Sequence, residues 1–169
     1  DSYYDLPTRS AKAGSLYEHC VRAITHGLRM GTHGLPLIGM CDWNDGMDRV
    51  GHLGRGESVW LAFFLYDILC QFKPLAELKS DPEFAQRCTD EAKRLRQNIH
   101  DNAWDGHWYR RAYFDDGTPL GSDGNEECKI DSISQSWSVL SAAGEESRMQ
   151  MAMQSLNTHL VKRDDNLVL

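Results

Sequence analysis

The chain has 169 residues, of which 41% are hydrophobic and 25% charged, and its formal net charge is −7. This composition indicates one globular domain, or part of one, and excludes a disordered chain. The acidic balance gives no support to nucleic-acid binding, which needs a basic surface. The five cysteines are isolated, without a C-x-x-C pair, which favours reduced thiols in a cytosolic setting and argues against a zinc site.

The first predicted helix follows an irregular lead-in over residues 1–14, which has no initiator Met and fits a cut made inside a larger protein. Ser15 and Glu18 stand at the N-cap and third helical positions of a capping box. Apolar residues then recur at intervals of three and four, which is the period of a helix with one apolar face. We expect this helix to end near Gly31 or Gly34.

The second predicted helix begins at Glu57 or Ser58 and runs to about Phe72. It is apolar nearly all round, which is typical of a buried helix. Its longest apolar run is far shorter than the roughly 20 residues needed to cross a bilayer, so we expect this part of the protein to be soluble. Pro74 is expected to end the helix, because proline lacks the donor that a helix interior requires.

The remainder of the chain predicts three more helices and one hairpin. Asp81-Pro82 is a good start signal for an amphipathic helix over 82–100. Turn signals at 105–106 and 116–117 predict a short hairpin within 104–121. Helices are expected over 130–141 and 145–161, with no closing element after them. Alternating buried and amphipathic helices indicate an all-α fold of the α/α-barrel kind, with function in the long loops 31–56 and 104–131.

The run Asp42-Trp43-Asn44-Asp45 lies between Gly39 and Gly46 and has the composition of a pocket. An indole stacks on the apolar face of a sugar ring and keeps its N–H for a hydrogen bond. A carboxyl beside such a ring, partly shielded from water, is favoured in its protonated form. The residues therefore predict a carbohydrate pocket with a general acid. A calcium loop is excluded, because glycine comes one place early for an EF-hand and the closing Glu is missing.

For several neighbouring residues the sequence is compatible with two roles. Arg55 and Glu57 can form an ion pair or brace the loop, which we favour over contact with substrate. Strand alternation puts Arg110 and Arg111 on opposite faces, so that at most one of them points inward. A polar cluster further along is either an acceptor-side sugar site or a solvated loop; its members are Glu126, Glu127, Lys129, Asp131 and Gln135.

Five blocks of this sequence, in order, resemble glycoside hydrolase family 94, and most closely the phosphorylase-type domain of cyclic β-1,2-glucan synthases and the β-1,2-oligoglucan phosphorylases. The blocks are GLPLIG at 34–39, DWNDGM at 42–47, GHLGRGESVWL at 51–61, WYRRAYFDDG at 108–117 and CKIDSISQSW at 128–137. The resemblance implies that residues 1–169 are a single partial catalytic domain, the middle portion of an (α/α)₆ barrel.

The resemblance also implies a mechanism, inverting phosphorolysis of β-glucosides. The family's general acid falls on Asp45 and its sugar-lining indole on Trp43. From the residues themselves, Asp42 and Asn44 either bind sugar hydroxyls or brace the loop, and Glu127, Lys129 and Gln135 of the polar cluster are the candidate acceptor-side contacts. Inorganic phosphate is itself the nucleophile, so no second carboxylate and no cofactor are required.

The family's phosphate-binding residues lie further downstream, so this piece alone is expected to be inactive. Its expected partners are a β-glucan oligosaccharide and phosphate, with no nucleic acid and no membrane contact, and self-association through exposed apolar helix faces is plausible. The expected location is the cytoplasmic side of a bacterial inner-membrane protein. Two alternatives remain: a non-catalytic glucan-binding module serving a glycosyltransferase, and a glucoside hydrolase.

Overall fold

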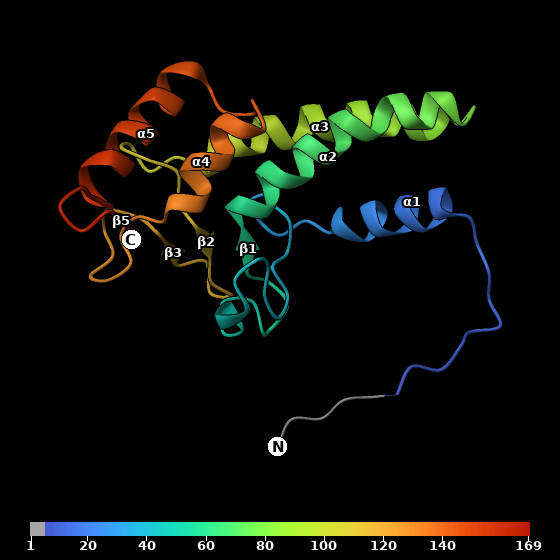
Figure 1. Ribbon diagram of the computed structural model, residues 1–169, viewed down its shortest axis with the longest axis horizontal. Helices are drawn as coiled ribbons and strands as arrows, with labels where there is room; N and C mark the ends of the chain where they lie inside the picture. The colour runs from blue at the N-terminus through green and yellow to red at the C-terminus, as the bar shows by residue number, and fades with distance from the viewer. Residues whose placement is uncertain (1–5) are drawn as a thin grey trace.

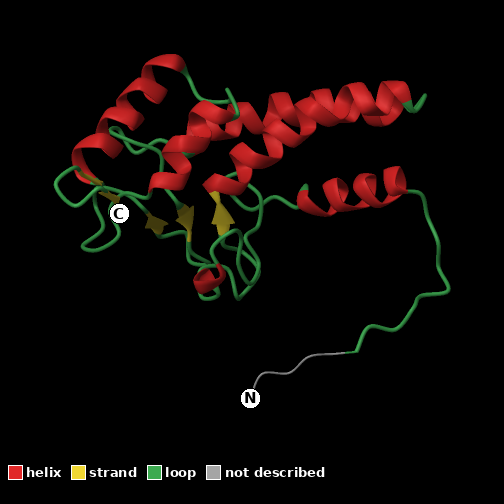
Figure 2. Ribbon diagram, viewed as in Figure 1, coloured by secondary structure: helices red, strands yellow, loops and turns green. Residues whose placement is uncertain are grey.

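The computed structural model describes residues 6–169, and helices dominate this part of the chain (Figures 1 and 2). Helices α2 and α3 form a long hairpin, with α1 alongside α2 and the shorter α4 and α5 at the opposite end (Figure 1). This arrangement agrees with the predicted helical architecture. The helices are α1 (Leu16–Gly27), α2 (Val59–Leu78), α3 (Pro82–Asn102), α4 (Ser132–Leu140) and α5 (Glu146–His159).

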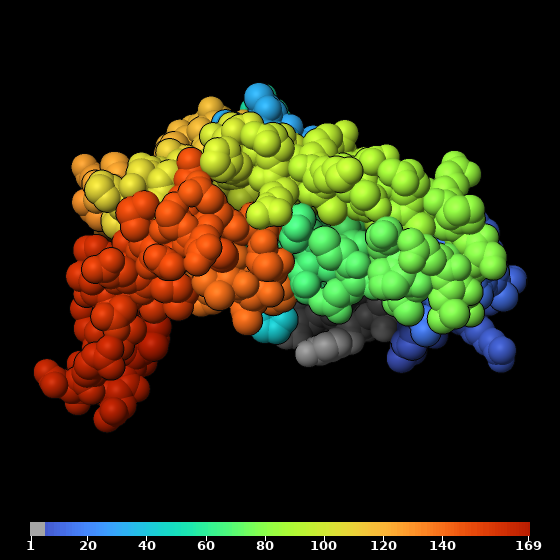
Figure 3. All heavy atoms as spheres, turned by 90° about the horizontal axis from the view of Figure 1, so that it is seen from above, coloured from blue at the N-terminus to red at the C-terminus, as the bar shows by residue number. Residues whose placement is uncertain are grey.

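The hairpin of α2 and α3 carries the main core. Both helices begin at a side-chain cap: Ser58 accepts the Leu61 N–H, and Asp81 accepts the Phe84 N–H. Phe72 of α2 meets Phe84 of α3 edge to face, with ring centroids 5.8 Å apart. These two helices, adjacent in sequence, supply most of the buried core, which also includes Ile24 of α1, Tyr113 and Ala152 of α5. From above, the two lie side by side, and the C-terminal segment projects from one end (Figure 3).

The capping box at the start of α1 is confirmed, since Ser15 and Glu18 satisfy one another's backbone N–H groups. The helix ends at Gly27, earlier than the predicted Gly31 or Gly34. Beyond it the chain turns back on itself, because Met30 forms an isolated bridge with Pro36. The bridge takes up the residues over which the helix was expected to continue.

The prediction that Pro74 ends the second helix is wrong. Helix α2 continues through Pro74 to Leu78. Phe72 and Ala76, on either side of the proline, are both buried in the core, whereas Pro74 itself is exposed. Burial of the apolar face against α3 outweighs the hydrogen bond that the proline forfeits.

A small three-stranded antiparallel sheet lies beneath the start of α2 (Figure 1). Strand β2 (Ala112–Tyr113) is central, between β1 (Glu57–Ser58) and β3 (Pro119–Leu120). The predicted hairpin is thus confirmed for β2 and β3, with Gly117 at a φ of 86° in the turn. Strand β1 was not predicted, and it joins the start of α2 to the middle of this sheet.

The prediction of no closing element is wrong as well. Strands β4 (Val161–Lys162) and β5 (Leu167–Val168) pair antiparallel after α5. Their connection contains Asn166 at a φ of 52°, a left-handed conformation that asparagine tolerates better than most residues. Two-residue strands are too short to show an alternating pattern in the sequence.

Helix α2 is also the one helix within residues 6–169 that is long and apolar enough to cross a membrane, with a mean hydropathy of 1.3. This test considers only the length and the composition of the helix. In the fold, 44% of the window is buried inside the protein. Packing in the helical core is sufficient reason for its apolar character.

Candidate functional site

The acid loop, residues 42–47, follows the short apolar stretch 35–40 and ends in the 3₁₀ turn η1 (Asp45–Met47). Its apolar anchor is a small separate core of Ile38, Val50 and Ala112, against which Met47 packs. In Figure 1 the turn lies below β1, at the end of the sheet remote from the helices. The apolar contacts of the loop are therefore with this small core beside the sheet.

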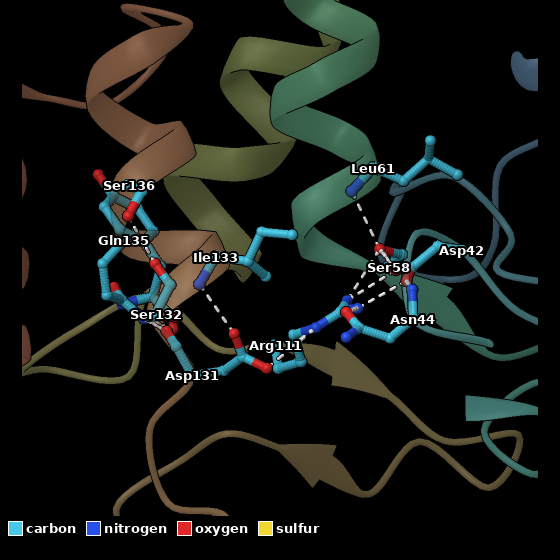
Figure 4. A network of polar contacts seen from close by, with 11 residues as sticks. Asp42, Asn44, Ser58, Leu61, Arg111, Asp131, Ser132, Ile133, Gln135 and Ser136 are labelled. Atoms are coloured by element: carbon cyan, nitrogen blue, oxygen red, sulfur yellow. Dashed lines mark hydrogen bonds and ion pairs between the residues drawn. The ribbon is translucent and has the colours of Figure 1, made fainter. Parts of the chain in front are cut away.

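Arg111 is the main polar attachment of the acid loop (Figure 4). Arg111 is the residue immediately before β2. Its guanidinium donates through Nη1 to Asp42 Oδ2 at 2.7 Å and through Nη2 to Asp42 Oδ1 at 2.6 Å. The side chains of both residues are almost completely shielded from water, at 1% and 0% exposure. This two-pronged pairing of guanidinium and carboxylate is the strongest hydrogen-bonding arrangement available to these groups.

Two further side chains complete the attachment. Ser58 donates to Asp42 Oδ2 at 2.6 Å while accepting the Leu61 N–H that caps α2. Asn44 accepts from Arg111 Nη2 at 3.0 Å. The acid loop is thereby joined to the start of α2 and to β2, two elements more than a dozen residues away in sequence.

The charge of Asp42 is held by these contacts. Burial alone raises the pKa of this carboxyl, since it disfavours the charged form. The hydrogen bonds from Arg111 and Ser58, the positive charge of Arg111 and the Asn44 N–H together outweigh burial, so the pKa of Asp42 is lowered. Asp42 is thus a carboxylate whose acceptor sites are occupied by protein groups, which fits the loop-bracing role of the two predicted for it.

Glu57 has the bracing role favoured for it. Its buried carboxylate accepts the backbone N–H groups of His33 and Leu35, both at 3.0 Å, and contacts His33 Nδ1 at 2.5 Å. These contacts hold the segment that leads toward the acid loop. Within the described residues Glu57 pairs with His33 and forms no ion pair with Arg55, whose backbone N–H donates to Asp115.

Asp115 fixes the glycine-rich segment after the acid loop. Its carboxylate accepts the N–H groups of Leu53 and Arg55 at 2.8 Å and of Gly56 at 3.0 Å. Gly56 has to be glycine, since a Cβ there would collide with the Val50 carbonyl group. The sequence pattern did not single out Asp115, because its partners are backbone groups about 60 residues away.

Asp45 and Trp43 both lie at the surface of the acid loop. Asp45 is exposed in η1. Trp43 is 73% exposed, and its ring centroid lies 6.4 Å from that of Trp60. Their roles as proton donor and sugar platform stay predictions, and neither side chain is turned into the interior.

A cavity of about 480 Å³ opens beside Trp43. Its walls come from the acid loop, from residues 130–137 around the start of α4, and from Leu169 at the end of the chain. The indoles of Trp43 and Trp137 are among them, and the polar lining residues are Asn44, Asp131, Ser132 and Ser136. This volume is within the range of roughly 300–1,000 Å³ found for small-molecule sites. Over residues 6–169, no three His, Cys, Asp or Glu side chains are grouped to hold a metal ion.

The structure separates the predicted acceptor-side residues. Glu127 and Lys129 are exposed in the loop before α4. Gln135 is fully buried; its amide accepts the Tyr109 N–H at 2.9 Å and donates to the carbonyl groups of Tyr109 and Asp131. Gln135 therefore braces α4 against the Tyr109 backbone, and its side chain does not reach the cavity surface.

Arg111 is the site residue that the sequence did not identify by itself. Strand alternation is confirmed, since Arg110 turns the other way and donates to the carbonyl oxygens of Asn102 and Trp104. Which of the two arginines faces the acid loop depends on the position of Asp42, 69 residues earlier. A pairing at that separation leaves no local signal in the sequence.

The family model of the glycosyl hydrolase 94 superfamily, catalytic domain, matches residues 1–169. The chain belongs to this family. The resemblance drawn from the five sequence blocks is thereby confirmed, and with it the fold class, since the helices are part of the family's (α/α)₆ barrel catalytic domain.

Relatives within this family include a synthase and several phosphorylases. The chain is 44% identical over 169 residues to the cyclic beta-(1,2)-glucan synthase NdvB of Rhizobium meliloti, covering 99% of this chain and 6% of that protein. It is 34% identical to the solabiose phosphorylase of Paenibacillus borealis, covering 92% of this chain and 20% of that enzyme. The glycosyl hydrolase 94 chain thus spans a fifth or less of the length of these relatives.

A solved structure supports the fold independently of close sequence similarity. The GH78 family rhamnosidase of Bacillus sp. GL1 superposes with a TM-score of 0.63 at 20% identity, over 85% of this chain and 15% of that one. At this identity the likeness concerns the fold alone.

Proposed function

We propose that the parent protein of this glycosyl hydrolase 94 chain cleaves β-glucosidic bonds by inverting phosphorolysis, with a β-1,2-linked glucan as substrate. The observation that carries the proposal is the acid loop: Asp45 and Trp43 are exposed on a loop whose neighbouring Asp42 is pinned by Arg111. A proton donor and a sugar platform need such fixed positions, because a displacement of about 1 Å can cost on the order of 100-fold in rate.

In the proposed step, an oxygen of inorganic phosphate attacks the anomeric carbon from the face opposite the leaving group. The bond between that carbon and the glycosidic oxygen breaks, and Asp45 gives its proton to the departing oxygen. The products are α-glucose 1-phosphate and a glucan shortened by one unit. The phosphate-binding groups would come from other parts of the parent protein.

The experiment uses the intact parent catalytic domain with a linear β-1,2-glucan oligosaccharide and phosphate. Asp45→Asn should lower the rate of glucose 1-phosphate release by at least about 100-fold, the usual contribution of a general acid. Asp48→Asn is the matched control, because Asp48 is an exposed carboxylate three residues further on. Full activity of Asp45→Asn would refute its assignment as the proton donor.

A second candidate function is favoured by the 44% identity to a protein named as a cyclic glucan synthase. In such a parent the domain would trim glucan precursors, or would bind glucan for a neighbouring glycosyltransferase without cleaving it. Phosphate-dependent turnover by the isolated intact domain excludes the binding-only role. Release of glucose without phosphate would instead identify a hydrolase.

A further inference from the structure

A second cavity, of about 270 Å³, lies between α3 and the connection from α4 to α5. One wall is formed by side chains of α3, namely Lys93, Arg96, Gln97, Ile99 and His100. Arg148, in the first turn of α5, joins the two sides by donating to the His100 carbonyl at 2.6 Å. Seen from above, the corner between α4 and α5 abuts α3 (Figure 3). None of the lining residues belongs to the acid loop or to the cavity beside Trp43.

Helix α3 presents a row of basic side chains to this cavity. Lys93, Arg96 and His100 follow one another at intervals of three and four residues, so they share one face of the helix. All three are exposed, and none forms an ion pair within residues 6–169. Arg96 also faces the hydroxyl of Tyr66, which carries no charge to balance it. In a chain with a net charge of −7, this basic row is a local excess of positive charge.

The carboxylates beside the basic row do not neutralise it. Glu145 is the one carboxylate among the described lining residues, and its Oε2 lies 3.5 Å from Arg148 Nε. Asp101 accepts from the Gln97 side-chain amide through both of its oxygens and forms no ion pair in the described part of the chain. The positive charge of the row is thus left to attract a ligand.

The opposite wall of the cavity carries a buried hydroxyl. This wall is formed by Tyr109, Ala143 and Glu145. Tyr109 is only 1% exposed, and its ring meets Phe63 and Trp104 edge to face. Its hydroxyl end reaches the cavity, because it faces the Glu145 backbone N–H. The hydrogen bonds that Tyr109 donates or accepts through its backbone go to Gln135, and within residues 6–169 its hydroxyl hydrogen has no acceptor.

The Tyr109 hydroxyl keeps its hydrogen at neutral pH. Burial raises the pKa of Tyr109 and outweighs the Glu145 N–H and the positive charge of Arg148, which both favour the ionised form. A neutral phenol donates one hydrogen bond. Because buried polar groups are normally paired, this hydroxyl fits an acceptor that a ligand supplies.

These groups together select a small anion with several acceptor oxygens. A guanidinium donates to phosphate oxygens in pairs, and an ammonium group attracts phosphate as a point charge. The oxygens of a tetrahedral phosphate group point in several directions, so they can meet the basic row on one wall and Tyr109 on the other. The cavity is slightly smaller than the range of roughly 300–1,000 Å³ for small-molecule sites. It therefore suits a phosphate group with a small substituent and not a glucan chain.

We propose that this cavity binds the phosphate group of a small ligand at a site separate from the acid loop. Lys93 and Arg96 supply the positive charge, His100 an imidazole donor and Tyr109 the buried donor. The inference goes beyond the proposed function, because none of these residues takes part in the proposed bond cleavage. Inorganic phosphate and a sugar phosphate share the recognised group, and the experiment separates them.

The test measures acetylation of Lys93 in the intact catalytic domain by mass spectrometry, with inorganic phosphate or glucose 1-phosphate as the probe. No glucan is added, so glucose 1-phosphate is not consumed. At ten times the dissociation constant, the bound probe should slow acetylation of Lys93 by about 10-fold, the factor that mass action sets. Lys79, exposed at the end of α2, is the internal control. Sodium chloride at equal ionic strength controls for screening.

Three variants connect the protection to the proposed contacts. Arg96→Gln removes one cation, keeps a good helix former and should raise the half-protecting concentration by about 10-fold. Tyr109→Phe removes the hydroxyl alone and should raise it by about 5-fold, as expected for one neutral hydrogen bond. Arg94→Gln is the matched control on the same helix, because Arg94 pairs with Glu91, and it should leave the concentration unchanged.

The half-protecting concentrations of the two probes show whether free phosphate or the sugar ester is the better ligand. The site is overturned if neither probe protects Lys93 more than Lys79, or if chloride protects it equally. It is also overturned if Arg96→Gln and Tyr109→Phe both behave as Arg94→Gln does. Such a failure leaves the proposed function standing, because the assay of Asp45→Asn measures glucose 1-phosphate release independently of this cavity.

Discussion

Replacement of Arg111 by methionine would leave the buried Asp42 carboxylate without its two short hydrogen bonds. Breaking a buried ion pair on one side typically costs about 3–5 kcal/mol, because the remaining charge is uncompensated. We expect Arg111→Met to lower the urea midpoint of the intact domain accordingly. Arg49→Met, at an exposed arginine, is the control. An unchanged midpoint in Arg111→Met would contradict the central role of this pair.

The Asp42 carboxylate also determines how the free energy of unfolding changes as the pH is lowered. The pKa of Asp42 is lower in the folded state than its unfolded value of about 3.9. Its contribution to the free energy of unfolding is therefore present above that value and is lost as the pH falls through the folded-state pKa. Asp115, whose pKa is also lowered, acts in the same direction.

Thermal unfolding between about pH 6 and pH 3 checks this linkage. The wild-type domain should lose stability progressively toward the acid end. The Arg111→Met variant should show a shallower decline, because its Asp42 no longer has the stabilising partner. Identical slopes for the two proteins would mean that Arg111 does not account for the lowered pKa.

At the scale of single residues, the chemistry assigned to the acid loop stays a prediction, and the contacts that hold the loop in place were not predicted. Asp42, Trp43 and Asn44 are consecutive in the sequence, so their shared loop was predictable without the structure. Arg111 and Asp131 were recognised only as polar candidates, because their relation to the loop depends on pairing across the fold. Gln135 was expected at the sugar and is instead a buried brace.

At the scale of elements, Pro74 offers a direct test of why α2 continues. The residue is exposed inside the helix, so its ring contributes little to the core while its missing N–H leaves a gap in the hydrogen-bond ladder. Pro74→Ala should raise the free energy of unfolding by about 1–2 kcal/mol, after allowance for the greater freedom of the unfolded chain. Urea unfolding measures it, and a lower midpoint would show that the proline has a packing role.

Elements with a local cause were predictable, and elements with a distant cause were not. The starts of α1, α2 and α3 each carry a capping side chain that is visible in the sequence. Strands β1, β4 and β5 have two residues each and owe their existence to a partner strand. The hairpin of β2 and β3 was predictable because its turn has its own signal at Asp116-Gly117.

At the scale of the whole molecule, the chain presents apolar surface beside its core. A groove between α1 and α2 is lined by apolar side chains, among which Leu16 is 80% and Leu78 79% exposed. The chain spans about a fifth of the phosphorylase relatives, whose remaining length is outside it. The expectation that this piece self-associates through such faces stays a prediction.

The double engagement of Ser58 links two motions that would otherwise be independent. Its hydroxyl oxygen caps the N-terminus of α2 by accepting the Leu61 N–H, while its hydroxyl hydrogen is donated to Asp42. Fraying of the first turn of the core helix and release of the segment bearing Asp45 therefore share one hydrogen-bonded joint. The rigidity of the longest apolar helix is in this way transmitted to a surface loop that has little regular structure of its own.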